Sequence, residues 1–237
     1  MAMSVVRPTQ MGSDGARPAH KEIVPVFLTR FWKRTAVTAL TTTIALAAGA
    51  SSASAGVLVA AAPDCEQQTT QKTFLPWWDI ADYTALSGGD FEGAGDGWSL
   101  TGGAAIAGGN EPYHVGGAGD AHSLSLPAGS SATSPAICVG LAHPTMRFFA
   151  KRQSGGWLSL ASVRVDVLFE TSTGQVASLP IGFAGNGGSW QPTSPMLVVA
   201  NLLPLLPGER TPVAFRFTAQ GGDFSVDDVW VDPYGRK

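Results

Sequence analysis

Residues 158–170 read LSLASVRVDVLFE, and this stretch decides the fold class. Four apolar side chains fall on one face of an extended chain here: Val163, Val165, Val167 and Phe169. The charged side chains fall on the other face: Arg164, Asp166 and Glu170. Because successive side chains of a strand point to opposite faces, this alternation predicts an antiparallel strand with one buried face and one polar face.

Other short apolar runs, separated by Gly, Pro, Asn and Ser, surround this strand. They predict further strands at residues 98–101, 122–126, 136–139, 146–150, 212–218 and 224–231. Short strands at this spacing are typical of an all-β antiparallel β-sandwich, and we expect almost no helix after Ala62. Residues 196–206 are apolar nearly throughout. They form either a strand buried on both faces or a crossover loop lying on the core.

The N-terminal part of the chain has a different composition. The basic residues Arg30, Lys33 and Arg34 precede an apolar run at residues 35–50, and small residues follow at 53–55. This order predicts a secretory signal peptide that is cleaved near residues 55–62. Retention of the segment as a membrane anchor is the alternative.

We therefore expect a bacterial protein that is secreted or associated with the cell envelope. Its predicted parts are an N-terminal extension plus signal peptide at 1–62, an irregular aromatic arm at 63–87, and a β-sandwich domain at 88–237.

The exported part is acidic. The first 62 residues hold six of the 15 Lys/Arg and two of the 18 Asp/Glu, so the remainder holds nine basic and sixteen acidic residues. Nucleic acids and anionic membranes need a basic face on their protein partner. The charge balance argues against nucleic acid as a partner, and a membrane would be a partner only through an uncleaved signal segment.

The chain has two cysteines, Cys65 and Cys138, and both follow the predicted signal segment. In an oxidising compartment a single disulfide between them is the simplest interpretation. Two buried free thiols are the alternative.

Two short motifs bracket the sandwich domain. Residues 88–92 (GGDFE) and 96–98 (DGW) stand near its start, and residues 226–229 (VDDV) stand near its end. Together they resemble the galactose-binding-like jelly rolls, which include several carbohydrate-binding modules. The whole exported part, with FLPW at 74–77 and VDPY at 231–234, is also similar to a family of uncharacterised secreted bacterial proteins. The resemblance implies a jelly-roll sandwich with Trp98 in its core.

The same resemblance implies a structural calcium ion between the first and last strands. The matching residues are Glu92, Asp227 and Asp228. Calcium is bound by carboxylate and carbonyl oxygens, and carboxylates brought together need a cation between them. Asp227 shares a face with Val229, so we expect it to be the ligand and Asp228 to be a turn-side or surface acid. The alternative is that these acids cap turns or pair with Arg147 or Arg216.

Sugar binding is the function that the resemblance implies. Aromatic rings stack on the apolar face of a pyranose, while charged and amide groups bind its hydroxyls. The candidate ligand-binding residues are Tyr113, Trp157, Trp190 and Trp230, together with Arg164, Asp166 and Arg216 on the polar face of the predicted strands. The alternative for each tryptophan is a place in the core.

The sequence carries no recognisable catalytic constellation. It has no nucleophile elbow, and His114, His122 and His143 lack the spacing of a zinc protease. We therefore expect a secreted, non-catalytic binding module for carbohydrate or cell-wall glycan. The alternative is a structural or protein-interaction protein of the bacterial envelope. An aromatic arm packed over the binding face would favour that alternative.

Overall fold

The computed structural model describes Leu58 and residues 68–140, 144–155, 160–171, 173–185, 187–199 and 210–233. The chain divides into the units Met1–Ala50 and Ser51–Lys237, and all described residues belong to the second. The predicted signal segment lies outside the described residues, apart from Leu58, and so do Cys65 and Trp157. Across the described ranges, we find no helix with the length and hydrophobicity needed to span a membrane.

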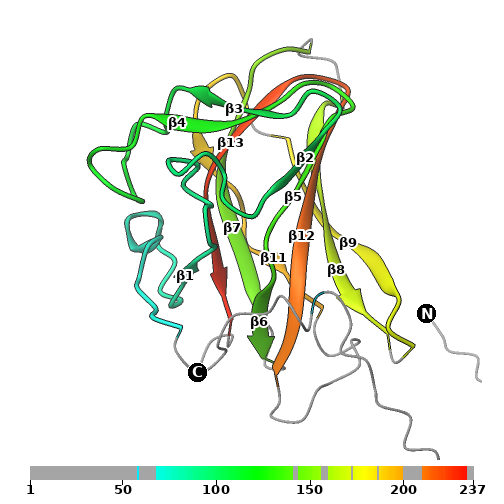
Figure 1. Cartoon of the computed structure of the whole chain (residues 1–237). Helices are drawn as coiled ribbons and strands as arrows, with labels where there is room; N and C mark the ends of the chain where they lie inside the picture. The colour runs from blue at the N-terminus through cyan, green and yellow to red at the C-terminus, as the bar shows by residue number, and fades with distance from the viewer. Residues whose placement is uncertain are drawn as a thin grey trace, which may run out of the picture. The chain divides into compact units, whose positions relative to one another are not determined.

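Two antiparallel sheets pack face to face (Figure 1). The seven-stranded sheet has the order β10-β7-β13-β4-β3, with β1 added to β13 and β11 added to β7. Its strands are β1 (Thr84–Ala85), β3 (Ala105–Gly108), β4 (His122–Leu126), β7 (Thr145–Arg152), β10 (Gln191–Pro192), β11 (Met196–Leu197) and β13 (Phe224–Asp232).

The six-stranded sheet has the order β2-β5-β12-β8-β9, with β6 added to β12. Its strands are β2 (Ser99–Thr101), β5 (Ser131–Thr133), β6 (Ile137–Gly140), β8 (Ser162–Glu170), β9 (Val176–Ala184) and β12 (Arg210–Gln220). Together the two sheets confirm the predicted antiparallel β-sandwich.

The core lies between the sheets and is built from the predicted apolar faces. Val163, Val165 and Val167 of β8 are buried beside Phe215 and Phe217 of β12. Leu124, Leu126, Phe148 and Val226 come from the facing sheet. Trp98 joins this core, as expected, and donates its indole N–H to the Ser87 carbonyl at 3.0 Å. Burial of each such side chain contributes about 1.5–3 kcal/mol.

The arm is more regular than the sequence indicated. Residues 68–87 contain the short 3-10 helix η1 (Leu75–Trp77), strand β1, and a bridge between Gln71 and Tyr83. The prediction of an irregular arm was therefore wrong in this part. Phe74 and Tyr83 anchor the arm, because both are fully buried in a second apolar cluster with Phe149 and Trp230.

The two sequence motifs meet as expected. The Leu86 N–H donates to the Val229 carbonyl at 2.9 Å, and the Val229 N–H donates to the Gly89 carbonyl at 3.0 Å. A Cβ at Gly89 would lie 2.9 Å from the Leu86 carbonyl and 3.1 Å from that of Val229, so only glycine fits this close approach. The first and last strands of the domain, β1 and β13, are paired.

Several strands were not predicted. Strand β9 contains Pro180 and Gly182, which weaken the strand pattern, and it has a bulge opposite Val165 and Asp166. Strand β3 lies within the glycine-rich residues 102–117, for which no strand was predicted. Of residues 196–206, only Met196–Leu197 is a strand among the described residues.

Candidate functional site

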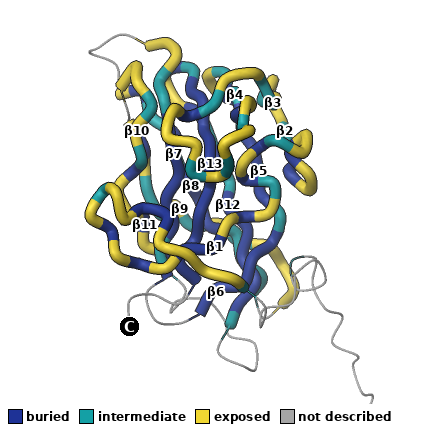
Figure 2. Tube along the Cα trace, turned by 90° about the vertical axis from the view of Figure 1, so that its left-hand side faces the viewer, coloured by how far each residue is buried: buried dark blue, intermediate teal, exposed yellow. Residues whose placement is uncertain are grey.

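The two sheets differ in what covers their outer faces. On the seven-stranded sheet, Arg147, Phe149 and Trp230 are buried beneath the arm. Figure 2 looks onto this side and shows β7 and β13 buried along most of their length. The outward residues at the centre of the six-stranded sheet are mostly half-buried or exposed: Ser99, Thr133, Arg164, Ser178, Phe183 and Arg216. This sheet therefore offers the accessible surface.

Three of the predicted binding residues meet on that surface. Asp166 of β8 lies opposite Arg216 of β12 in the strand register. Its Oδ1 accepts hydrogen bonds from Arg164 Nε at 2.9 Å and Nη2 at 2.6 Å. Its Oδ2 lies 3.4 Å from Arg216 Nη2. Asp166 is only 1% exposed, so this carboxylate holds the Arg164 guanidinium in place from below, whereas its contact to Arg216 is long.

An aromatic ring stands next to this charged group. Phe183 of β9 is 61% exposed and lies directly opposite Arg164 in the register. Opposed side chains on a sheet face have Cβ atoms about 5 Å apart, so the ring and the guanidinium are neighbours. We call Arg164, Asp166, Ser178, Phe183 and Arg216 the open face. Phe183 was not among the predicted binding residues, because β9 itself was not predicted.

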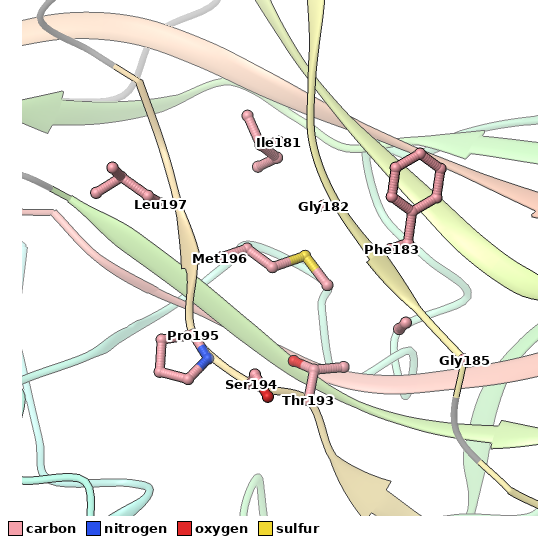
Figure 3. A pocket seen from close by; sticks show the side chains of 10 residues that line it. Ile181, Gly182, Phe183, Gly185, Thr193, Ser194, Pro195, Met196 and Leu197 are labelled. Carbon is pink, nitrogen blue, oxygen red and sulfur yellow. The ribbon is translucent and has the colours of Figure 1, made fainter.

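A cleft of about 420 Å³ adjoins the open face at the edge of the sandwich (Figure 3). One wall of the cleft is formed by residues 181–185, at the end of β9. The other wall is formed by residues 193–197, at β11 and the segment before it in the facing sheet. Phe183 lines both the cleft and the open face. The Met196 side chain packs directly against Gly182, because a Cβ at Gly182 would lie only 2.7 Å from Met196 Sδ. Met196 therefore fills the space between the two walls of the cleft on the core side. The open face and the cleft therefore meet at Phe183.

Three of the predicted aromatic residues, Tyr113, Trp190 and Trp230, lie on the side of the sandwich that carries the arm. Trp230 is 6% exposed beneath the arm, so its prediction as a ligand-binding residue is corrected to a packing role. Trp190 is half-buried against the same cluster. Tyr113 is 44% exposed, and its ring centroid lies 5.0 Å from that of Trp77 in the arm. The structure thus separates these three aromatic candidates from Arg164, Asp166 and Arg216, while Trp157 lies outside the described residues.

Buried carboxylates gather where the first and last motifs meet. Asp227 and Asp228 are both buried, and so is Glu111 from the loop before β4. Asp227 Oδ2 accepts the Glu111 N–H at 3.0 Å, and Asp228 Oδ2 accepts the Gly116 N–H at 3.3 Å. Glu111 accepts the N–H groups of Tyr113 and, at 2.7 Å, Val115.

The prediction of Asp228 as a surface acid was wrong, since Asp228 is only 2% exposed. The register of β13 shifts between Asp227 and Trp230, and Asp228 has a φ of 48°. Because of this bulge, Asp227 does not share the inward face of Val229, contrary to the expectation, but lies opposite Phe149 on the arm side of the sheet. Both carboxylates are buried against the loop that carries Glu111 and Gly116.

Burial changes the acidity of these groups. It raises the pKa of Asp227 to about 9, with Asp228 and Glu111 adding to the effect through their charges. Burial, and then the Glu111 carboxyl, raise the pKa of Asp228 to about 8. The described neighbours of this pair are carboxyl groups and backbone N–H groups that donate to them. Of these groups, only the carboxylate oxygens are ligands that a hard cation such as calcium prefers.

Glu92 occupies the edge of this acidic group. Its Oε1 accepts the N–H groups of Ala121 and His122, each at 2.6 Å, and its Oε2 lies 2.9 Å from His122 Nδ1. Burial alone would raise its pKa, but these contacts outweigh burial and lower it. Within the described residues, no group of three His, Cys, Asp or Glu side chains is arranged to hold a metal ion.

Asp120 connects Glu92 to the buried pair. Burial raises the pKa of Asp120, and so does the charge of Glu92. A Cβ at Gly116 would collide with Asp228 Oδ1 and lie 2.7 Å from Asp120 Oδ2, so glycine here lets the two carboxylates approach the loop backbone. No feature of the sequence indicated that Glu111 and Asp120 belong to this group.

No protein-family model and no curated protein matches the chain. Solved structures similar to it include the CBM22-1–GH10 modules of endo-1,4-beta-D-xylanase 10B of Clostridium thermocellum, complexed with xylohexaose. That match has 17% identity over 62% of this chain and 28% of that chain, with a TM-score of 0.42. The enzymatically active domain of tailspike protein 4 of bacteriophage CBA120 gives 17% identity over 62% of this chain and 21% of that chain, with a TM-score of 0.42.

A shorter structure is covered almost entirely. The CBM22-2 xylan-binding domain from Paenibacillus barcinonensis gives 14% identity over 61% of this chain and 97% of that chain, with a TM-score of 0.43. The chain thus covers well under a third of the first two structures and nearly all of the third. The β-sandwich itself rests on the chain's own two sheets.

Proposed function

We propose that the protein is a non-catalytic binding module that recognises carbohydrate or cell-wall glycan on the open face. The observation that carries this proposal is the position of exposed Phe183 beside the Arg164–Asp166–Arg216 group, on the sheet that the arm leaves uncovered. An aromatic ring supplies a stacking surface for a pyranose, and fixed guanidinium groups donate hydrogen bonds to its oxygens. Because Asp166 already holds the Arg164 guanidinium, binding through Arg164 costs less side-chain entropy.

A structural or protein-interaction role in the bacterial envelope is the second candidate. The arm favours it, because it covers Phe149 and Trp230 and presents Leu75, Trp78 and Ile80 to solvent. Trp78 is 94% exposed at the end of η1, where its backbone N–H donates to the Leu75 carbonyl. The two candidates therefore use opposite sides of the sandwich.

Export, membership of the secreted bacterial family and a structural calcium ion complete the proposal. The basic cluster, the apolar run and the small residues at 53–55 support export. Buried Asp227, Asp228 and Glu111 support the ion, because a cation would offset the repulsion among these carboxylates. Calcium would then stabilise the junction of the first and last strands.

Glycan binding by the protein purified from culture medium tests the main proposal. We expect Phe183→Ala to weaken binding about tenfold, the scale of one aromatic contact. Trp78→Ala removes an exposed aromatic from the opposite side and serves as the matched control, so it should leave glycan binding unchanged. The reverse result, with Trp78 needed and Phe183 dispensable, would move the binding surface to the arm. Failure to bind any glycan would leave the envelope role.

A further inference from the structure

The open face carries positive charge on a chain that is otherwise acidic. Arg164 and Asp166 form a close pair, since both contacts to Asp166 Oδ1 are 2.9 Å or shorter. The Asp166 carboxylate therefore neutralises less of the Arg216 positive charge, because its Oδ2 lies 3.4 Å from Arg216 Nη2. At the far end of β8 and β12, the outward positions hold one acid and one base, Glu170 and Arg210.

Arg216 also keeps hydrogen-bonding capacity. The contacts of its guanidinium in the described structure are Asp166 Oδ2 and Ser178 Oγ, both at 3.4 Å. This distance is at the outer limit of a hydrogen bond, and a guanidinium has five N–H donors. About a third of the Arg216 side chain is exposed, so the remaining donors can reach a ligand. A planar guanidinium fork suits a carboxylate or a phosphate better than a neutral hydroxyl.

The spacing of the groups indicates the size of the ligand. Phe183 lies opposite Arg164 on β9, whereas Arg216 lies on β12, two strands away and level with Asp166. From the spacing of strands and residues in a sheet, the two backbone positions are about 12 Å apart. Phe183 and Arg216 would therefore contact different sugar rings of one oligosaccharide.

We propose that the open face selects anionic glycans, with Arg216 binding the carboxylate or phosphate of one sugar residue while Phe183 stacks on another. This proposal rests on glycan binding at the open face and specifies the chemistry of the ligand. The rest of the chain has an excess of acidic residues, and their negative charge would repel a polyanion. We therefore expect an anionic glycan to bind at the open face and not at other surfaces.

A pair of ligands with the same sugar backbone tests the charge directly. Oligogalacturonate carries a carboxylate on each ring, and its methyl ester does not. We expect the acid form to bind at least about tenfold more tightly than the ester, with the preference shrinking as salt is added. A glycerol-phosphate teichoic acid tests whether phosphate can serve as the anion. Binding of the teichoic acid without binding of the uronate would assign the anion as phosphate and keep the proposal.

Substitutions of Arg216 separate charge from shape. Arg216→Gln should remove the preference for the acid form, and Arg216→Lys should retain part of it because the charge remains. Neither change should lower the melting temperature much, because both contacts of Arg216 are long. Lys72→Gln removes an exposed cation from the arm and is the matched control, with the preference unchanged.

Equal affinity for acid and ester would overturn the proposal and leave glycan binding standing. Full preference in Arg216→Gln would also overturn it. No binding to any charged or neutral glycan would instead end the proposed function itself.

Discussion

At the scale of single residues, the buried acids of the last strand are the most informative feature. Asp227 and Asp228 hold protons more tightly in the folded chain than in the unfolded chain, where their pKa is near 3.8. The stability that comes from protonation is therefore fully present below about pH 4 and is lost as pH rises through about 8 to 9. Bound calcium would hold the carboxylates as anions and replace the proton.

This linkage predicts a pH dependence that calcium removes. In EDTA, the melting temperature should fall between about pH 6 and about pH 9, a window above the range where ordinary carboxyls titrate. In saturating calcium, the melting temperature should be higher and nearly constant over the same window. Thermal unfolding followed by circular dichroism measures both.

Variants locate the ion within the acidic group. Asp227→Asn and Asp228→Asn should each lose most of the calcium response. Glu92→Gln should keep more of it, because the contacts of Glu92 are with Ala121 and His122. A melting temperature that is indifferent to calcium in the unaltered protein would rule out the ion.

At the scale of elements, the arm depends on one buried ion pair. Arg147 Nη1 donates to Asp79 Oδ2 at 2.9 Å, and the guanidinium lies 4.3 Å from the centre of the Phe74 ring. Arg147 Nε also donates to the Thr193 carbonyl at 2.7 Å, and Asp79 accepts the Tyr83 hydroxyl at 2.8 Å. This network joins the arm to β7 and to the segment that borders the cleft.

Breaking the pair should release the arm. Asp79→Asn leaves the Arg147 charge buried without its partner, so we expect a loss of about 3–5 kcal/mol in the free energy of unfolding. Urea unfolding measures the loss, and limited proteolysis should cut the variant within residues 68–87. Lys72→Gln is the control for an exposed pair, with a loss of at most about 1 kcal/mol. Equal protease resistance in Asp79→Asn would show that Phe74 and Tyr83 hold the arm without the ion pair.

At the scale of the whole molecule, Gln68 contacts strand β6 of the six-stranded sheet. Gln68 Nε2 donates to the Cys138 carbonyl at 3.0 Å, and Cys138 is fully buried in β6. Three residues span at most about 11 Å, so the position of Gln68 keeps Cys65 within reach of Cys138. This supports the predicted disulfide, which remains a prediction because Cys65 lies outside the described residues.

The disulfide should cross-link one peptide pair in a non-reduced digest of the secreted protein. Reduction should lower the free energy of unfolding by up to about 4 kcal/mol, because the bond closes a long loop. The double variant Cys65→Ser/Cys138→Ser should match the reduced protein. Two thiols that react with an alkylating agent in freshly secreted, denatured protein would establish the free-thiol alternative.

The sequence by itself determined the fold class and the inward residues of the main strands. Alternation is a local property of a strand, so Val163, Val165 and Val167 were assigned correctly without knowledge of their partners. The adjacency of the first and last motifs was also expected, from their resemblance to jelly rolls. The charged residues of the open face were predicted because they share the polar side of β8 and β12.

Only the tertiary structure decided which residues meet and which remain accessible. Glu111 joins Asp227 because distant segments come together, and Asp228 is buried against the loop at Gly116 beside a bulge that alternation does not reveal. Trp230 is covered by the arm, which comes from the other end of the chain's described part. Phe183 is exposed on β9, a strand that was not predicted because Pro180 and Gly182 weaken its sequence pattern. Each outcome depends on contacts between parts of the chain far apart in sequence, and the periodicity of a single segment carries no information about them.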